Sequence, residues 1–240
     1  MIYLARIEYD GTDFFGWQIQ RDKRTIQGEI MKALKRITGI SVKVVGASRT
    51  DRGVHARGQL ASFHFPEEPK LGPEELKRAM NAILPHDIYI HEMKKVDADF
   101  NARYRAKKKK YVYRILPEKR SPIRRRFLLE LPFTPDLGIL NESASYLKGT
   151  IDFSFLKIEE GKSPNVEFEK AMWYRVEDEY VFEVVANRFL YKLVRMLVGM
   201  MLKAAWKFKD AGAFKKFLDG EDEHIWVVPP RGLTLDEVYI

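Results

Sequence analysis

Residues 48–56 read Ser-Arg-Thr-Asp-Arg-Gly-Val-His-Ala, and they follow a valine-rich run at 42–45. The run is typical of a strand, and Gly53 permits a turn directly after it. Asp51 therefore stands where a strand ends, between two arginines. A neighbouring guanidinium can hold such a carboxylate charged and oriented. This arrangement suits chemistry on an anionic substrate.

A surface aspartate in a salt bridge is the structural alternative for Asp51. The density of cations argues against it, because Arg49, Arg52 and Arg57 all lie within six residues of that carboxylate. Clustered arginines bind phosphate groups. We therefore interpret Asp51 as a candidate catalytic carboxylate, and Arg52 and Arg57 as candidate contacts to a nucleic-acid backbone.

The composition favours a polyanionic partner. The chain has 240 residues, 45% of them hydrophobic, and a net charge of +8. Such a length builds one large domain or two smaller ones, and the charge favours nucleic acid or an anionic membrane surface. A soluble protein that is merely basic is the alternative explanation of the charge.

Several classes of site are excluded or disfavoured. The sequence holds no cysteine, which excludes disulfides, thiolate nucleophiles and cysteine-type zinc sites. The most apolar stretch, 189–206, carries three cations and is a poor membrane span. The first residues do not resemble a signal peptide. We therefore expect a cytoplasmic protein with no membrane partner.

Hydrophobic periodicity predicts an α+β chain in two halves. The first half reads strand, helix, strand, strand, helix, strand, and the second half partly repeats that order. This split βαβ order suggests two ferredoxin-like halves, 1–105 and 106–240. The expected strands are 2–9, 42–47, 58–65, 87–96, 111–116, 169–176, 181–187 and 235–240. The expected helices are 26–38, 73–84, 139–147, a long one from about 189 and a short one through 214–218. Loops are expected at 117–135, which begins with a strongly basic run at 117–126, and at 158–167.

A basic strip spans residues 99–114, where seven cations alternate with three tyrosines. A solvated linker followed by an ordinary strand would explain this pattern. The functional interpretation is a surface that binds an RNA backbone, with aromatic rings available for base stacking. Within the strand, Tyr111 and Tyr113 face the same side, so one can line a pocket while the other packs beside it. The candidate RNA-binding residues here are Arg103, Lys107, Lys108 and Lys109.

The expected long helix has a broad apolar face and an opposite stripe. The stripe contains Arg188, Lys192, Arg195 and Gly199. A solvated back face is the usual explanation of such a stripe. The functional interpretation is a stripe that faces RNA through Arg188 and Lys192, or an arginine that reaches into a cleft to pair with Asp51.

Several separated stretches of the chain form one ordered set with residues 49–56. They are Arg6-Ile7-Glu8-Tyr9-Asp10-Gly11-Thr12, Gly16-Trp17-Gln18, Thr25-Ile26-Gln27, Gly58-Gln59, Phe100-Asn101-Ala102-Arg103, Tyr111-Val112-Tyr113-Arg114, Asn187-Arg188-Phe189-Leu190, Val194-Arg195, Val198-Gly199 and Pro229-Pro230-Arg231-Gly232-Leu233. Together these stretches resemble the TruA-type tRNA pseudouridine synthases, and the resemblance runs nearly end to end. The family usually has glycine where this chain has Ser48, a small replacement that we expect to leave Asp51 in place.

The resemblance implies a pseudouridine synthase fold, with two ferredoxin-like halves, antiparallel sheets flanked by helices, and a central cleft. It implies an isomerase that converts uridine to pseudouridine at tRNA positions 38, 39 and 40, in the anticodon stem-loop, with no metal and no organic cofactor. Members of the family are typically homodimers whose tRNA contacts both subunits.

Residue matching gives each candidate a role. Asp51 matches the catalytic aspartate of the family, and Tyr111 matches a pocket tyrosine that stacks on the base. Arg195 matches the partner that keeps the aspartate ionised, and Arg49 is a second candidate for that pairing.

Two other classes of protein stay open on the residues alone. A non-catalytic RNA-binding protein would suit basic and aromatic strips on two ferredoxin-like halves, although the glycine-and-aromatic signature of an RNA-recognition motif is not visible. A nuclease would need clustered carboxylates for metal ions, and few acidic residues lie near Asp51 in the sequence. The five histidines show no spacing typical of metal ligands.

Overall fold

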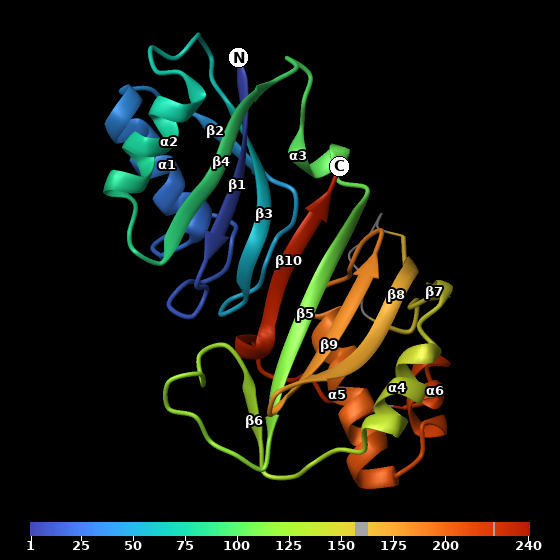
Figure 1. Ribbon diagram of the computed structural model, residues 1–240. Helices are drawn as coiled ribbons and strands as arrows, with labels where there is room; N and C mark the ends of the chain where they lie inside the picture. The colour runs from blue at the N-terminus through green and yellow to red at the C-terminus, as the bar shows by residue number, and fades with distance from the viewer. Residues whose placement is uncertain (157–162, 223) are drawn as a thin grey trace. The chain divides into compact units, whose positions relative to one another are not determined.

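The computed structural model describes residues 1–156, 163–222 and 224–240 (Figure 1). The chain forms two compact units. The first comprises Met1–Lys107 with Thr234–Ile240, and the second comprises Lys108–Leu233. The division at residue 105 expected from the sequence assigned the last strand to the second half. Its contacts place it in the first unit, because it pairs in parallel with a strand that follows the Asp51 segment.

The first unit is a sheet covered by helices, in the expected order strand, helix, strand, strand, helix, strand. The strand order is β4-β1-β3-β10, and β2 also pairs with β3. The β3–β10 pairing is parallel, and the pairings of β3 with β1 and β2 and of β1 with β4 are antiparallel. The elements are β1 (Ile2–Tyr9), α1 (Ile26–Thr38), β2 (Lys43–Gly46), β3 (His55–His64), α2 (Pro73–Ile83), β4 (Ile88–Val96), α3 (Ala102–Arg105) and β10 (Leu233–Tyr239).

Helix α1 shows how the sequence determines these elements. The Thr25 side chain accepts a hydrogen bond from the Gly28 backbone N, and Gly39 ends the helix in the left-handed conformation. Between these caps, Ile26, Ile30 and Leu34 are fully buried. Figure 1 shows α1 and α2 together on one face of the sheet, so this apolar stripe faces the core.

The second unit is also a sheet backed by helices. Its strand order is β5-β9-β8-β7, and β6 pairs in parallel with β5. β5, α4, β8, β9 and α5 repeat the strand–helix–strand–strand–helix order of the first unit. The elements are β5 (Lys108–Pro117), β6 (Leu129–Leu131), α4 (Leu137–Ser145), β7 (Gly149–Asp152), β8 (Asn165–Val176), β9 (Glu179–Ala186), α5 (Leu193–Lys203), the π-helical turn η1 (Ala204–Phe208), α6 (Gly212–Leu218) and the 3₁₀ turn η2 (Pro230–Gly232).

Several elements differ from the expectation. The long helix begins at Leu193 rather than near 189, because Lys192 takes a left-handed φ of 59° at its N-cap. The segment 117–135 is not all loop, since it contains β6, and β7 and the α3 turn were not expected. Of the loop expected at 158–167, residues 158–162 lie outside the described residues and β8 already begins at Asn165. Strands as short as β6 and β7 carry too few alternating positions to be recognised.

Candidate active site

The segment 47–55 connects β2 to β3 and carries Asp51. Its first residues are held by Gln59, whose side chain is fully buried on β3. The Gln59 Nε2 donates to the Ser48 carbonyl at 2.7 Å, and the Ser48 backbone N donates back to Gln59 Oε1 at 3.2 Å. The buried Gln59 amide thus forms two hydrogen bonds with the Ser48 backbone, and these fix the position at which the segment leaves the sheet.

A second clamp acts on Thr50, the residue directly before Asp51. The Trp17 backbone N donates to the Thr50 carbonyl at 3.0 Å, and the Tyr9 hydroxyl lies 2.7 Å from Thr50 Oγ1. Gly16 permits this approach, because a Cβ there would lie 2.6 Å from the Thr50 carbonyl oxygen and its φ is +92°. The backbone before Asp51 is therefore fixed by neutral groups from residues 9–17.

The turn after Asp51 is equally well defined. The Val54 backbone N donates to the Asp51 carbonyl at 3.1 Å, and the Gly53 backbone N donates to the Phe14 carbonyl at 3.3 Å. Gly53 has a φ of 76°, as the sequence predicted for a turn glycine. The Asp51 side chain is half-buried, at the end of a backbone that is held on both sides.

His55 and Asp10 form a pair that holds the loop after β1. His55 is 3% exposed, and its Nδ1 lies 3.1 Å from Asp10 Oδ1 and 3.1 Å from the Gly11 backbone N. Burial by itself would raise the pKa of Asp10, but hydrogen bonds from His55 and Thr12 outweigh it and hold that pKa well below its usual range. His55 was noted in the sequence without a role, and only the fold reveals this one.

The arginines around Asp51 lie on the surface. Arg49 and Arg52 are exposed on the segment itself, and Arg57 is exposed on β3. The Arg52 guanidinium lies over the Phe15 ring, 4.4 Å from its centroid. This contact orients one cation beside the Asp51 turn. The first unit thus brings Asp51, Arg49 and Arg52 together on one short segment.

Tyr111 and Tyr113 lie side by side on β5 in the second unit. Both are buried, and Tyr111 meets the edge of Phe189 at a centroid distance of 5.0 Å. The Tyr113 hydroxyl donates to the Pro229 carbonyl at 2.8 Å. Burial raises the pKa of Tyr113 far above its usual range, so this hydroxyl stays protonated. Tyr113 therefore belongs to the core, as an ordinary strand would place it.

Arg195 lies in the first turn of α5 and is half-buried. Its Nε donates to the Val228 carbonyl at 2.7 Å, and the Val228 backbone N donates to the Arg195 carbonyl at 3.3 Å. At Gly199 a Cβ would lie 1.9 Å from the Trp226 carbonyl oxygen. The segment 226–230 therefore covers Arg195 and Gly199, and the solvated back face considered for the stripe is wrong for these two residues. The same segment also accepts a hydrogen bond from the Tyr113 hydroxyl, so it links Arg195 to Tyr113. No periodic pattern in the sequence indicates this link.

The remaining candidate RNA contacts have varied surroundings. Arg103 and Lys107 are exposed in the first unit. Lys108 pairs with Glu169 at 2.8 Å, while Lys109 is half-buried on β5. Arg188 and Lys192 are half-buried before α5, and the Lys192 ammonium lies 4.7 Å from the centroid of the Tyr191 ring.

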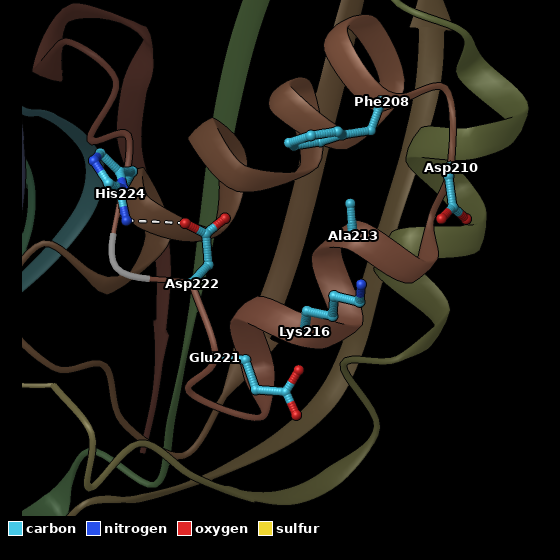
Figure 2. Close-up of a pocket in the computed structure, with 7 residues that line it drawn as sticks. All are labelled: Phe208, Asp210, Ala213, Lys216, Glu221, Asp222 and His224. Atoms are coloured by element: carbon cyan, nitrogen blue, oxygen red, sulfur yellow. Dashed lines mark hydrogen bonds between the residues drawn. The ribbon is translucent and has the colours of Figure 1, made fainter.

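A separate hollow of about 540 Å³ lies among η1, α6 and the segment after it (Figure 2). None of the residues proposed from the sequence lines it. Its Asp222 carboxylate is occupied, because it accepts from Lys203 Nζ at 2.8 Å and from the His224 backbone N at 2.9 Å. The hollow is lined by Phe208, Asp210, Ala213, Lys216, Glu221, Asp222 and His224.

Within residues 1–156, 163–222 and 224–240, no group of three or more His, Asp or Glu side chains is placed to hold a metal ion. No helix in the same ranges is long and apolar enough to cross a membrane.

Sequences from both units match a known protein family. The profile of a family described as tRNA pseudouridine synthase matches residues 5–105 and 143–239, which include Asp51 and Arg195. Three similar proteins are each named tRNA pseudouridine synthase A. The one from Dictyoglomus thermophilum is 38% identical over 98% of this chain and 97% of its own length. Those from Aquifex aeolicus and Caldicellulosiruptor saccharolyticus are 36% and 40% identical, over 99% and 98% of both chains.

Proposed function

Because this chain belongs to the tRNA pseudouridine synthase family, we propose that it isomerises uridine to pseudouridine in the anticodon stem-loop of tRNA, at positions 38, 39 and 40. Asp51 is the catalytic carboxylate in this proposal. The observation that carries it is the position of Asp51, on a turn whose backbone is clamped on both sides by Trp17 and Phe14. A catalytic group needs such a fixed backbone, because small displacements cost large factors in rate.

The reaction is an isomerisation, so atoms balance without a co-reactant. The bond from uracil N1 to ribose C1′ breaks, the base rotates, and C5 bonds to C1′. C5 then loses its proton, and N1 carries a proton in the product. The Asp51 carboxylate starts the first step by attack on the ribose, by attack on the base or by removal of a ribose proton. The target base must leave its stack, which costs a few kcal/mol that protein contacts offset.

Tyr111 and Arg195 are the proposed supporting residues. Tyr111 presents a buried ring on β5, which suits it to stack on the extruded base. The Nε bond of Arg195 to the Val228 carbonyl fixes the plane of its guanidinium. We assign Arg195 to keep the Asp51 carboxylate ionised, with Arg49 as the second candidate.

We propose a homodimer that acts in the cytoplasm and contacts tRNA through exposed cations, an assembly that light scattering on the purified chain tests. The candidate RNA contacts are Arg52, Arg57, Arg103, Lys107, Lys108, Lys109, Arg188 and Lys192.

The test is nucleoside mass spectrometry with position mapping on an unmodified tRNA transcript, incubated with the protein in EDTA. Pseudouridine confined to positions 38–40 is the expected result, and EDTA excludes a required divalent metal. Pseudouridine elsewhere would overturn the positional assignment. If tRNA binds and no pseudouridine forms, the non-catalytic RNA-binding alternative replaces the proposal.

A further inference from the structure

The connection between β5 and β6, residues 118–128, carries cations that the candidate active site does not use. Five of the ten residues at 117–126 are basic, namely Lys119, Arg120, Arg124, Arg125 and Arg126. The connection also falls between the two ranges matched by the family profile. Figure 1 shows it as a broad loop on the side of β5 away from α4 and α6.

Arg124 anchors this connection to the turn between β8 and β9. Its Nη1 donates to Asp178 Oδ1 at 2.9 Å and to Glu179 Oε1 at 3.0 Å, and its Nη2 donates to Asp178 Oδ2 at 2.9 Å. Lys119 Nζ reaches Asp178 at 3.4 Å, and Arg114 Nη1 donates to Glu179 at 3.0 Å. A forked guanidinium–carboxylate contact fixes orientation as well as distance.

Backbone hydrogen bonds fold the connection further. The Ser121 backbone N donates to Glu130 Oε1 at 2.6 Å. The Arg125 backbone N donates to the Ser121 carbonyl at 2.9 Å, and the Phe127 backbone N donates to the Arg124 carbonyl at 2.8 Å. The cations on this turn are therefore carried by a defined backbone rather than by an open loop.

Two of the arginines point outward. Arg120 and Arg125 are exposed, and neither forms an ion pair with any residue in the described ranges. The carboxylates of Asp178 and Glu179 bind Arg114, Lys119 and Arg124 instead. A rigid turn that presents arginines in this way offers a positive surface to an anionic partner.

We propose that residues 118–127 bind the phosphate backbone of the tRNA substrate through Arg120 and Arg125. The inference rests on the proposed function for the identity of the RNA. Guanidinium groups bind phosphate oxygens in pairs, and a surface held before binding loses less entropy when it binds. Ile123, which is 88% exposed between them in sequence, supplies an apolar contact for a ribose or base.

The test measures tRNA affinity for the variant Arg120→Gln/Arg125→Gln. Both side chains are exposed, so the fold tolerates the change, and a thermal melt checks this. We expect Kd for an unmodified tRNA transcript to rise about tenfold, and the slope of log Kd against log salt to fall by about 1.5, as the loss of two phosphate contacts requires. The kcat at saturating tRNA should not change.

The matched control is Lys215→Gln/Lys216→Gln on α6, which removes the same charge from two other exposed residues. An equal loss of affinity in the control would overturn the proposal, because net charge alone would then explain the effect. Unchanged affinity in the Arg120/Arg125 variant would also overturn it, and a changed oligomeric state in that variant would assign the surface to a second copy of the chain. Filter binding detects the contact even if no pseudouridine forms, so failure of this inference and failure of the proposed function are distinguishable.

Discussion

In residues 47–55 an aspartate is positioned through its backbone, whereas in residues 118–127 an arginine is positioned by carboxylates. Asp51 is flanked by residues whose main chains bond to Trp17 and Phe14. Arg124 is held by the side chains of Asp178 and Glu179. The two segments therefore position their charged side chains in different ways.

The difference separates two uses of a carboxylate. The Asp178 carboxylate forms ion pairs with Arg124 and Lys119, and these contacts hold the pKa of Asp178 well below its usual range. Such a group stabilises a turn and leaves the arginines beside it to face outward. The backbone of the 47–55 segment is held by hydrogen bonds from neutral groups of residues 9–17 and by a close approach of Gly16.

The largest expected effect distinguishes the two aspartates. Asp51→Asn should lower kcat by on the order of 10²–10⁴-fold or more, because an amide cannot act as the carboxylate base or nucleophile. Asp178→Asn, the matched control, should leave kcat at saturating tRNA unchanged. Single-turnover kinetics measures both. An equal loss of kcat in the two variants would contradict the assignment of a catalytic role to Asp51 and a structural role to Asp178.

The next effect tests the clamp on the Asp51 segment. Gly16→Ala and Gly39→Ala both place a side chain at positive φ, which costs about 1–2 kcal/mol. At Gly16 the new Cβ also meets the Thr50 carbonyl oxygen, whereas at Gly39 nothing lies within 4 Å. Urea unfolding should therefore show the larger loss for Gly16→Ala, and only that variant should lose kcat. A Gly16→Ala enzyme with normal kcat would remove the clamp from the account.

A smaller effect is expected from single hydroxyls on β1. Tyr9→Phe removes the group 2.7 Å from Thr50 Oγ1, and Tyr3→Phe removes the donor to the Leu71 carbonyl at 3.3 Å. Each should cost about 1 kcal/mol of unfolding free energy. Only Tyr9→Phe should also lower kcat, because only Tyr9 contacts the Asp51 segment. Equal kcat values for the two variants would contradict a positioning role for Tyr9.

The smallest effect is a pH dependence in the second segment. The lowered pKa of Asp178 gives a stabilisation that is fully present above the ordinary aspartate pKa and is lost as pH falls through the lowered one. Arg124→Gln should therefore lower the melting temperature at neutral pH and low salt. The difference from wild type should shrink below about pH 4 and in high salt. A difference that stays constant across pH would show that the ion pair is not the anchor.

Much of the first unit could be predicted from its sequence. Alternation in β1, the Thr25 and Gly39 caps of α1 and the valines of β2 each identify their element locally. The Asp51 turn could be predicted for the same reason, because a strand, an aspartate and Gly53 lie close together in the chain.

The rest depends on contacts between distant residues. No local pattern indicates that Gly16 lies against Thr50, or that the segment 226–230 covers Gly199 and bonds to Arg195 and Tyr113. The start of α5 depends on the left-handed Lys192, a conformation that a lysine does not signal. The basic run at 117–126 can be seen in the sequence. Which of its cations anchor the segment and which face outward depends on the turn between β8 and β9, because that turn supplies Asp178 and Glu179.

The most direct test of the central claim is release of tritium from tRNA that carries [5-³H]uridine, under single-turnover conditions with enzyme in excess. Isomerisation exchanges the C5 proton, so release reports the reaction itself. The account predicts full release by the wild type and no detectable release by Asp51→Asn while filter binding shows that the variant still holds the tRNA. Release by bound Asp51→Asn at the wild-type rate would contradict the assignment of Asp51 as the catalytic carboxylate.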